Sequence, residues 1–356
     1  MTDDRTSGTR GRRVVVTLLL LAGGVALLVY MARQLNLGYE DVRDGFQRIG
    51  VWFVAIFALS LGRFALRSYA WMTLTPFRVP LGAAIAATIS GDALGNITPL
   101  GLAASEPAKA LYLRRYGPPS ELLASLTAEN FFYSISVAIY VIVGAACMLQ
   151  FFALPDAVRL AGLVSTAGMT IVLAVACWLA WQKPTLASAL LARIPIARVQ
   201  SLVDRVRTFE ERAYGAAGHQ GSRLGIVAAC ELAFHALSFL ECWLIFWLLT
   251  GVSALLPALV FDAFNRVINI VFRVVPLKIG VEEGSTAVLA RAIGYASNGG
   301  FMLGLVRKAR VIVWAAVGLV LWARAGTSRS GTQGASGTSG TSGAQGTSGP
   351  QGKLGT

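Results

Sequence analysis

Two carboxylates stand at corresponding positions within otherwise apolar stretches of this sequence. The stretches read PLGLAASEPAKALYLRRYG from residue 99 and PLKIGVEEGSTAVLARAIG from residue 276. Each carries a glutamate seven residues after its proline, Glu106 and Glu283, and a shift of 177 residues makes seven of 22 positions identical. A carboxylate in an apolar environment either serves a transport pathway or pairs with an opposite charge. The sequence leaves both roles open for these two glutamates.

Each copy also predicts a helix that begins beside its glutamate. Ser105 and Pro107 flank Glu106 as a capping residue and a first-turn proline would, and Gly280 opens the second copy. Helix N-termini attract anions, especially with a lysine or arginine nearby. The candidate substrate-binding residues are the polar residues in or near the two copies and one arginine from an earlier apolar stretch: Arg67, Asn96, Glu106, Lys109, Arg114, Arg273, Lys278, Glu282 and Glu283.

Further ionisable side chains fall inside the long apolar stretches. Arg63 and Arg67 are four residues apart and therefore share one helix face, where Glu129 or Glu241 could neutralise them. We predict a structural, hydrogen-bonded role for His235. The secondary candidates for the site are Arg63, Asp92, Glu129, Glu241, Asp262, Arg266 and Arg307.

The composition predicts a membrane protein. Of 356 residues, 55% are hydrophobic and only 14% are charged, whereas a soluble domain is about 25% charged. The net charge of +13 comes from basic residues that lie mostly between apolar stretches, so we expect contact with lipid headgroups and not with nucleic acid. The four cysteines lie in apolar runs without metal-ligand spacing, and we predict neither a disulfide scaffold, nor a metal site, nor a cofactor.

About six stretches are long and apolar enough to cross a bilayer, which takes roughly 20 residues. They are 14–31, 51–74, 121–149, 158–181, 223–250 and 301–323. Two further segments, 79–117 and 254–294, are apolar but broken by prolines, glycines and charges. Broken backbone is tolerated at membrane depth only where protein or a water-filled cavity surrounds it. We therefore predict an all-α polytopic protein with two re-entrant or broken-helix hairpins, although either hairpin could be a pair of full spans.

The distribution of lysine and arginine predicts that both termini face the cytoplasm. With the six crossings above, seventeen basic residues fall on that side and seven on the other. A cytoplasmic segment, 1–13, precedes the membrane domain, 14–323, whose first apolar run is too long for a signal peptide. Within that domain, 194–217 predicts a basic amphipathic helix at the membrane surface. The segment 326–356 is rich in Gly, Ser and Thr, which predicts a flexible tail.

The order of spans and hairpins predicts an inverted repeat. Two spans, a hairpin and one span make a unit, and its copies cover about 14–149 and about 158–323. An odd number of crossings turns the second copy upside down. Inverted repeats whose broken helices meet near the midplane recur in transporters. We therefore expect the hairpins to enter from opposite faces and to line one cavity between them.

At these residues the chain resembles the transmembrane, flippase-like domain of lysylphosphatidylglycerol synthases, a family that includes stand-alone proteins such as the hopanoid-associated HpnL-type proteins. The family's first pattern is a stretch rich in Pro and Gly that leads into Gly-Glu-x-x-Arg. Glu106 and Lys109 match its acidic and basic positions, and Ser105 replaces its glycine. Arg67 resembles the arginine that family members carry in the second span.

The second family pattern is a proline followed by Gly-Val-x-Glu-Gly. Residues 280–284 match it, and Leu277 and Lys278 stand where glycines are common. The resemblance covers residues 14–323. It implies a multi-pass protein of the cell (inner) membrane that moves lipid without synthesising it, and so no enzyme. The implied partners are membrane lipids of the anionic, polyprenyl-phosphate, aminoacylated or hopanoid kind.

Three functions are compatible with these features. The first is a flippase-like translocator that moves a polar-headgroup lipid between leaflets. The second is an intramembrane enzyme that uses the paired carboxylates as acid and base, but the sequence has no H-E-x-x-H pair, G-x-S-x-G elbow or nucleotide-binding loop. The third is a structural partner of lipid-biosynthesis enzymes. We predict the first, and the sequence names neither the lipid nor the oligomeric state.

Overall fold

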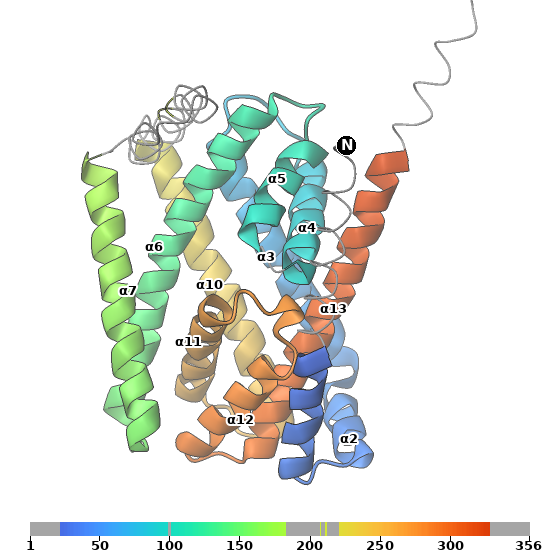
Figure 1. Ribbon diagram of the computed structural model, residues 1–356, viewed down its shortest axis with the longest axis vertical. Helices are drawn as coiled ribbons and strands as arrows, with labels where there is room; N and C mark the ends of the chain where they lie inside the picture. Colours follow the sequence, from blue (N-terminus) through green and yellow to red (C-terminus); the bar gives the residue numbers. More distant parts are fainter. Residues whose placement is uncertain (1–21, 99–100, 183–206, 208–210, 212–220, 328–356) are drawn as a thin grey trace, which may run out of the picture.

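The computed structural model of the protein describes residues 22–98, 101–182, 207, 211 and 221–327, and the regular elements in this part of the chain are helices (Figure 1). A first helix covers 22–34. The others are α2 (Tyr39–Ile49), η1 (Gly50–Trp52), α3 (Phe53–Thr73), α4 (Leu81–Ile97), α5 (Leu102–Tyr112), α6 (Pro119–Phe151), α7 (Asp156–Gln182), α10 (Gly221–Thr250), α11 (Leu255–Val271), η2 (Pro276–Lys278), α12 (Val281–Ala292) and α13 (Ser297–Thr327). The predicted segments 1–13 and 194–217, the latter apart from two residues, lie outside the described residues, as does the tail beyond Thr327.

Four helical stretches of the described chain are long and apolar enough to cross a membrane. They are Tyr39–Thr73, Pro119–Phe151, Asp156–Leu179 and Ser222–Thr250, and they contain most of the predicted spans 51–74, 121–149, 158–181 and 223–250. Helix α13 covers the predicted span 301–323 and has 31 residues, but it is not one of these four. The protein is therefore an all-helical, multi-pass membrane protein, and the number of six full crossings stays a prediction.

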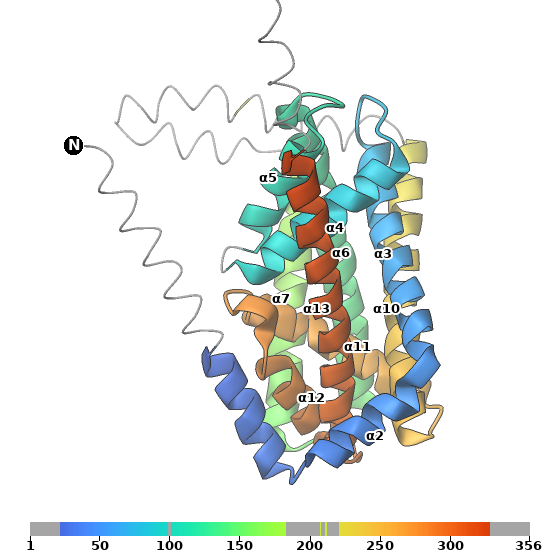
Figure 2. The ribbon, with the colours of Figure 1, turned by 90° about the vertical axis from the view of Figure 1, so that its right-hand side faces the viewer.

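The two predicted hairpin segments fold into pairs of short helices. In the first, α4 has 17 residues and α5 has 11, which correspond to about 25 and 17 Å at a rise of 1.5 Å per residue. Neither length reaches the roughly 30 Å of a bilayer core. Figures 1 and 2 place α4 and α5 towards one end of the bundle, and α11 and α12 towards the other. The second hairpin touches the first near mid-height, where η2 lies against α4.

The helices of the two halves correspond in length and in contacts. Helices α4 and α11 both have 17 residues, α5 and α12 have 11 and 12, and α6 and α13 have 33 and 31. Helix α4 packs on α13, whereas α11 packs on α6, so each hairpin lies against the last long helix of the other half. Helices α3 and α10 pack on each other. These matched lengths and exchanged contacts are what two copies of one unit would produce.

Apolar side chains fill both ends of the bundle and polar side chains fill its middle. Along α3, the buried face begins with Ile56 in one apolar cluster and ends with Trp71 in another. Ser60, Arg63 and Arg67 lie between them, at the helical spacing that keeps them on the same inner face. The sequence of α3 therefore directs a polar layer into the interior of an apolar bundle.

A glycine allows the close approach of α4 and α13. A Cβ atom on Gly318 would lie 2.5 Å from the carbonyl oxygen of Ile89 and 2.6 Å from the Cβ of Ala93. Real Cβ atoms do not come this close to a backbone oxygen, so any side chain here pushes the helices apart. The contact between the first hairpin and the last long helix therefore depends on Gly318.

We expect Gly318→Ala to lower the stability of the folded protein by about 1–3 kcal/mol, because an overpacked contact forces the backbone to shift. Thermal unfolding of the purified protein in detergent measures the effect. Gly82→Ala is the matched control, since Gly82 lies on α4 and a Cβ there would meet no atom within 4 Å. The control should unfold at the wild-type temperature or slightly above it, because alanine favours a helix. Equal losses in both variants would contradict this account of the α4–α13 contact.

Candidate functional site

A cavity of about 210 Å³ lies in the polar layer, between α3, α4, α6, α10 and α13. Its polar lining consists of Ser60, Arg63, Arg67, Asp92, Asn96, Tyr133 and Arg310. All but Ser60, Tyr133 and Arg310 belong to the candidates predicted from the sequence. Three arginines in one small cavity make a site for an anion, because guanidinium groups bind phosphate and carboxylate oxygens with two hydrogen bonds at a time.

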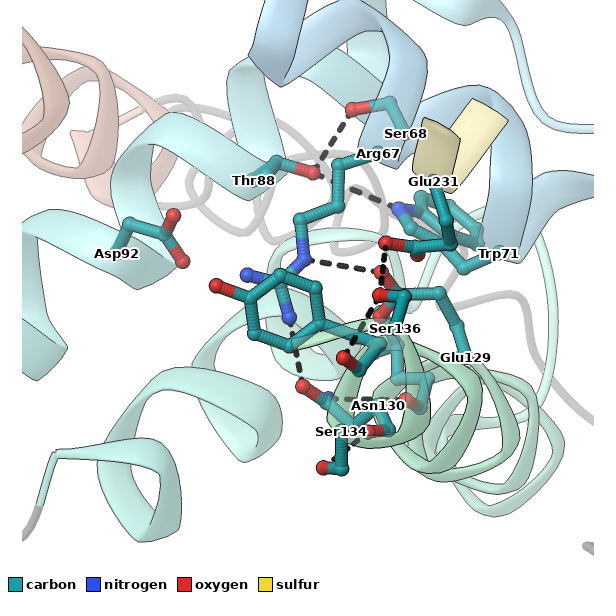
Figure 3. A network of polar contacts seen from close by, with 12 residues as sticks. Arg67, Ser68, Trp71, Thr88, Asp92, Glu129, Asn130, Ser134, Ser136 and Glu231 are labelled. Atoms are coloured by element: carbon teal, nitrogen blue, oxygen red, sulfur yellow. Dashed lines mark hydrogen bonds and ion pairs between the residues drawn. The ribbon is translucent and has the colours of Figure 1, made fainter. Parts of the chain in front are cut away.

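Arg67 is held in place from α6 (Figure 3). Its Nε donates to Oε1 of Glu129 over 2.9 Å, and its Nη2 donates to Oδ1 of Asn130 over 2.6 Å. The guanidinium carbon lies 4.3 Å from the centre of the Tyr133 ring, which adds a cation–π contact. Glu129 is 1% exposed, so its charge is available to Arg67 and to little else. The pairing of Arg67 with Glu129 confirms one of the two acidic partners predicted for the α3 arginines.

Arg63 shares a second carboxylate with an arginine of α13. Oε2 of Glu241 accepts from Nη2 of Arg63 over 2.9 Å and from Nη1 of Arg310 over 2.7 Å. The three residues come from α3, α10 and α13, so Glu241 ties three helices together. The contact of Arg63 with Glu241 confirms the other predicted partner. Arg310 is not among the residues predicted from the sequence, although its place one turn after Arg307, in an apolar stretch, is a signal that could have found it.

Asp262 forms the centre of an adjoining cluster. Its carboxylate is fully buried and accepts from Arg307 over 2.9 Å, from Ser238 over 3.0 Å and from Arg266 over 3.4 Å. Ser238 also accepts from Arg63 over 3.0 Å, which joins this cluster to the pair around Glu241.

The combined network holds more positive than negative charge. Four arginines share two carboxylates, which leaves a formal surplus of two positive charges, and the members are Arg63, Arg266, Arg307 and Arg310 with Glu241 and Asp262. Arg63 and Arg310 present part of this surplus to the cavity. A surplus of positive charge inside an apolar bundle favours an anionic ligand.

The first hairpin places its own ion cluster beside the cavity. Lys109, on α5, is 2.9 Å from Asp92 of α4 and 3.2 Å from Glu106, and Ser105 donates to Asp92 over 3.2 Å. Lys109 is 3% exposed, whereas the side chain of Asp92 is 28% exposed and lines the cavity. Glu106 therefore contacts Lys109, which in turn contacts Asp92. Of these three residues, Asp92 is the one that a ligand in the cavity can reach.

The second hairpin uses its two glutamates locally. Glu282 pairs with Lys308 of α13. Glu283 accepts a hydrogen bond of 2.8 Å from the backbone N–H of Gly280 and so caps its own helix, α12. Glu106 and Glu283 correspond in sequence, but in the described part of the chain neither forms an ion pair between the halves. Among the described residues, that role belongs to Arg63 and Glu241.

The turn η2 has an unusual backbone at the two positions where Leu277 and Lys278 replace glycines common in the resembled pattern. Their φ angles are 53° and 49°, in the left-handed region that favours glycine. Lys308 donates to the carbonyl oxygen of Leu277 and thereby holds the turn. Strained backbone of this kind concentrates at functional positions.

A comparison with protein families places the chain. The family model described as lysylphosphatidylglycerol synthase TM region matches residues 14–323. The protein belongs to this family. The match agrees with the resemblance seen at Glu106, Lys109 and residues 280–284. Neither the curated proteins nor the solved structures contained a match.

The remaining residues that we predicted for the site lie away from the cavity. Arg114 and Arg273 are exposed, and Lys278 is half-buried on η2. Arg273 packs against the position of Gly101, at the turn of the first hairpin. No three His, Cys, Asp or Glu side chains of the described residues are grouped as a metal site.

His235 and a glutamate that sequence reasoning missed lie between α6 and α10. His235 Nε2 is 3.0 Å from Oγ of Ser136, and its ring stacks on Tyr140, which is the hydrogen-bonded, structural arrangement predicted for it. Ser136 also contacts Glu231 over 3.2 Å, and Glu231 is only 5% exposed. Its place in an apolar stretch, one turn before His235, was the available signal.

Proposed function

We propose that this protein moves a lipid with an anionic headgroup between the leaflets of the cell (inner) membrane, and that the headgroup crosses through the polar cavity. The observation that carries the proposal is the cavity lined by Arg63, Arg67 and Arg310 inside an apolar bundle. Charged side chains are costly inside a membrane and usually mark a substrate pathway there. The proposal includes no chemical change of the lipid.

The supporting chemistry is the arrangement of cations around the cavity. Glu129 pairs with Arg67, and Glu241 pairs with Arg63. These ion pairs hold the two guanidinium groups in place, so that the groups need little rearrangement to bind a phosphate. Asp92 and Asn96, on α4, offer hydrogen-bond acceptors to hydroxyl or amine groups of the same headgroup. A phosphate-containing headgroup with further polar groups fits this set better than a neutral sterol-like lipid does.

The arrangement of the helices supports a transport cycle. In this proposal, α4–α5 and α11–α12 are re-entrant hairpins that enter from opposite faces, the halves are inverted copies, six helices cross fully, and both termini are cytoplasmic. Each hairpin packs on the last helix of the other half, so a rocking of one half moves both hairpins together. Inverted repeats with broken helices near the midplane allow alternating access in this way.

The test is lipid movement in proteoliposomes. The full chain is reconstituted, and fluorescent lipids are followed as they become accessible to a quencher outside. We expect faster exchange than in protein-free liposomes for at least one anionic phospholipid or polyprenyl-phosphate lipid. Neutral-headgroup lipid is the control and should exchange at the protein-free rate. Rates equal to protein-free liposomes for all these lipids would overturn the proposal.

A further inference from the structure

The cavity in the polar layer is too small to enclose a membrane lipid. Its volume is about 210 Å³, whereas pockets that enclose a drug-sized ligand have roughly 300–1,000 Å³. A lipid whose headgroup lies against Arg63 and Arg310 must therefore keep its tail outside the bundle. The tail needs an apolar path from the cavity wall to the surrounding lipid.

The apolar part of the cavity wall comes mostly from three helices. The residues are Phe64 of α3, Ile89 and Ala93 of α4, and Val311, Trp314 and Ala315 of α13. A tail that leaves the cavity along this wall must pass between two of these helices. Three boundaries are therefore possible exits: α4–α13, α3–α4 and α3–α13.

Two of these boundaries are closed by direct contact. Between α4 and α13, the position of Gly318 lies so close to Ile89 and Ala93 that not even a methyl group fits. Between α3 and α4, the buried hydroxyl groups of Ser68 and Thr88 are 2.9 Å apart and form a hydrogen bond (Figure 3). A tail cannot pass either boundary without breaking backbone packing or a buried hydrogen bond.

The third boundary, between α3 and α13, is filled by aromatic side chains. The buried hydrogen bond that crosses it, from Nη1 of Arg310 to Oγ of Ser60, is longer than that of the α3–α4 boundary, at 3.4 Å. The ring of Trp314 lies 5.7 Å from that of Phe57 and 5.2 Å from that of Phe64, measured between ring centres. We call these three residues the aromatic seam. Leu61 on α3 and Val313 on α13 are both 43% exposed, so the flanks of the seam face the surrounding lipid. Figure 2 shows both helices along the height of the bundle.

We propose that the aromatic seam is the lateral portal through which the tail of the transported lipid reaches the membrane. The proposal rests on the proposed function and adds the path of the tail to it. Side-chain rotations of Trp314 and Phe64 open this path without breaking a backbone hydrogen bond. The indole Nε1 of Trp314 is buried without a hydrogen-bond partner among the described residues, so no polar contact holds the ring in place.

The carboxylate of Glu241 links the portal to the headgroup. It forms ion pairs with Arg63 of α3 and with Arg310 of α13, and it thereby links the two helices that border the seam. An anionic headgroup in the cavity competes with Glu241 for the same guanidinium groups. Arrival of the headgroup therefore loosens the tie between α3 and α13, and the seam opens when a lipid is present.

Photolabelling locates the tail independently of transport. The full chain is reconstituted with phosphatidylglycerol that carries a diazirine in one acyl chain, and the labelled peptides are mapped by mass spectrometry. With this phosphatidylglycerol, we expect severalfold more label at the seam than on the lipid-facing surface of α7. With diazirine-labelled phosphatidylcholine, we expect the seam and α7 to be labelled equally. Equal labelling of the seam and α7 with both lipids, or anion-dependent labelling of another helix boundary, would overturn the portal.

A reversible cross-link tests whether the seam must open. In a background without the four native cysteines, Phe64→Cys and Trp314→Cys are joined by a reducible bifunctional reagent. The control pair is Leu149→Cys with Gly162→Cys, where α6 and α7 touch. We expect the seam cross-link to slow lipid exchange severalfold, with recovery on reduction, and the control cross-link to leave it unchanged.

Unchanged exchange with a completely cross-linked seam would contradict the portal. Failure of the proposed function gives a different result, because exchange would then already be absent before cross-linking. In that case the photolabelling still decides whether a lipid tail occupies the seam.

Discussion

Replacing Asp262 with alanine is expected to destabilise the folded protein by about 3–5 kcal/mol, the usual effect of breaking a buried ion pair. The carboxylate is fully buried and accepts hydrogen bonds from Arg307, Arg266 and Ser238 at 2.9, 3.4 and 3.0 Å. Its removal leaves two guanidinium groups in the interior of an apolar bundle without a carboxylate. The cluster also joins α10, α11 and α13, so its loss weakens the half that carries the second hairpin.

Thermal unfolding in detergent, followed by circular dichroism and by size-exclusion chromatography, measures this effect. Asp156→Ala is the control, because Asp156 is an exposed residue in the first turn of α7 and its loss should change stability by at most about 1 kcal/mol. The double variant Asp262→Ala with Arg307→Met should recover part of the loss, since it removes one of the stranded charges. An unchanged unfolding temperature for Asp262→Ala would show that Asp262 does not hold this cluster.

Arg63→Gln is expected to slow exchange of an anionic lipid by about one to two orders of magnitude. A hydrogen bond to a charged group contributes about 1.5–3 kcal/mol, and every 1.4 kcal/mol corresponds to a factor of ten. Arg63 lies near the middle of α3 and lines the cavity. The variant should still fold, because Glu241 keeps its contact of 2.7 Å with Arg310.

Arg266→Gln provides a matched control for the exchange assay. It makes the same chemical change at a buried arginine. In this variant Asp262 still pairs with Arg307, just as Glu241 still pairs with Arg310 in Arg63→Gln. Arg266 does not line the cavity. We therefore expect this variant to exchange lipid at a rate close to that of the wild type. Equal slowing of both variants would point to a general loss of structure, and no slowing of Arg63→Gln would exclude it from the headgroup path.

The membrane class and most of the helices follow from the sequence because they depend on local properties. Long apolar stretches, such as 121–149 and 223–250, must become helices in lipid, since every backbone polar group there needs a partner within its own segment. The predicted ranges lie within α6 and α10. The shared face of Arg63 and Arg67 likewise follows from helical geometry, and so does the need for buried carboxylates opposite them.

The positions of partners along different helices were less accessible to sequence reasoning. Arg310 and Glu241 are 69 residues apart, and no periodicity relates α13 to α10. Their contact depends on the rotation of each helix about its axis and on how closely neighbouring helices approach. Gly318 controls one such approach, but its role is visible only once Ile89 of α4 is placed beside it.

What the sequence determined by itself is therefore the kind of protein, the helices and the residues that must be buried with their charge. The tertiary structure decided where these residues meet. We predicted a cavity between the two hairpins, whereas the cavity described above lies beside α4, against α3 and α13. Glu106 and Glu283 correspond in the sequence, yet one pairs with Lys109 and the other caps its own helix. The physical reason is that a charge buried in lipid requires a partner, but the packing of whole helices selects which one it finds.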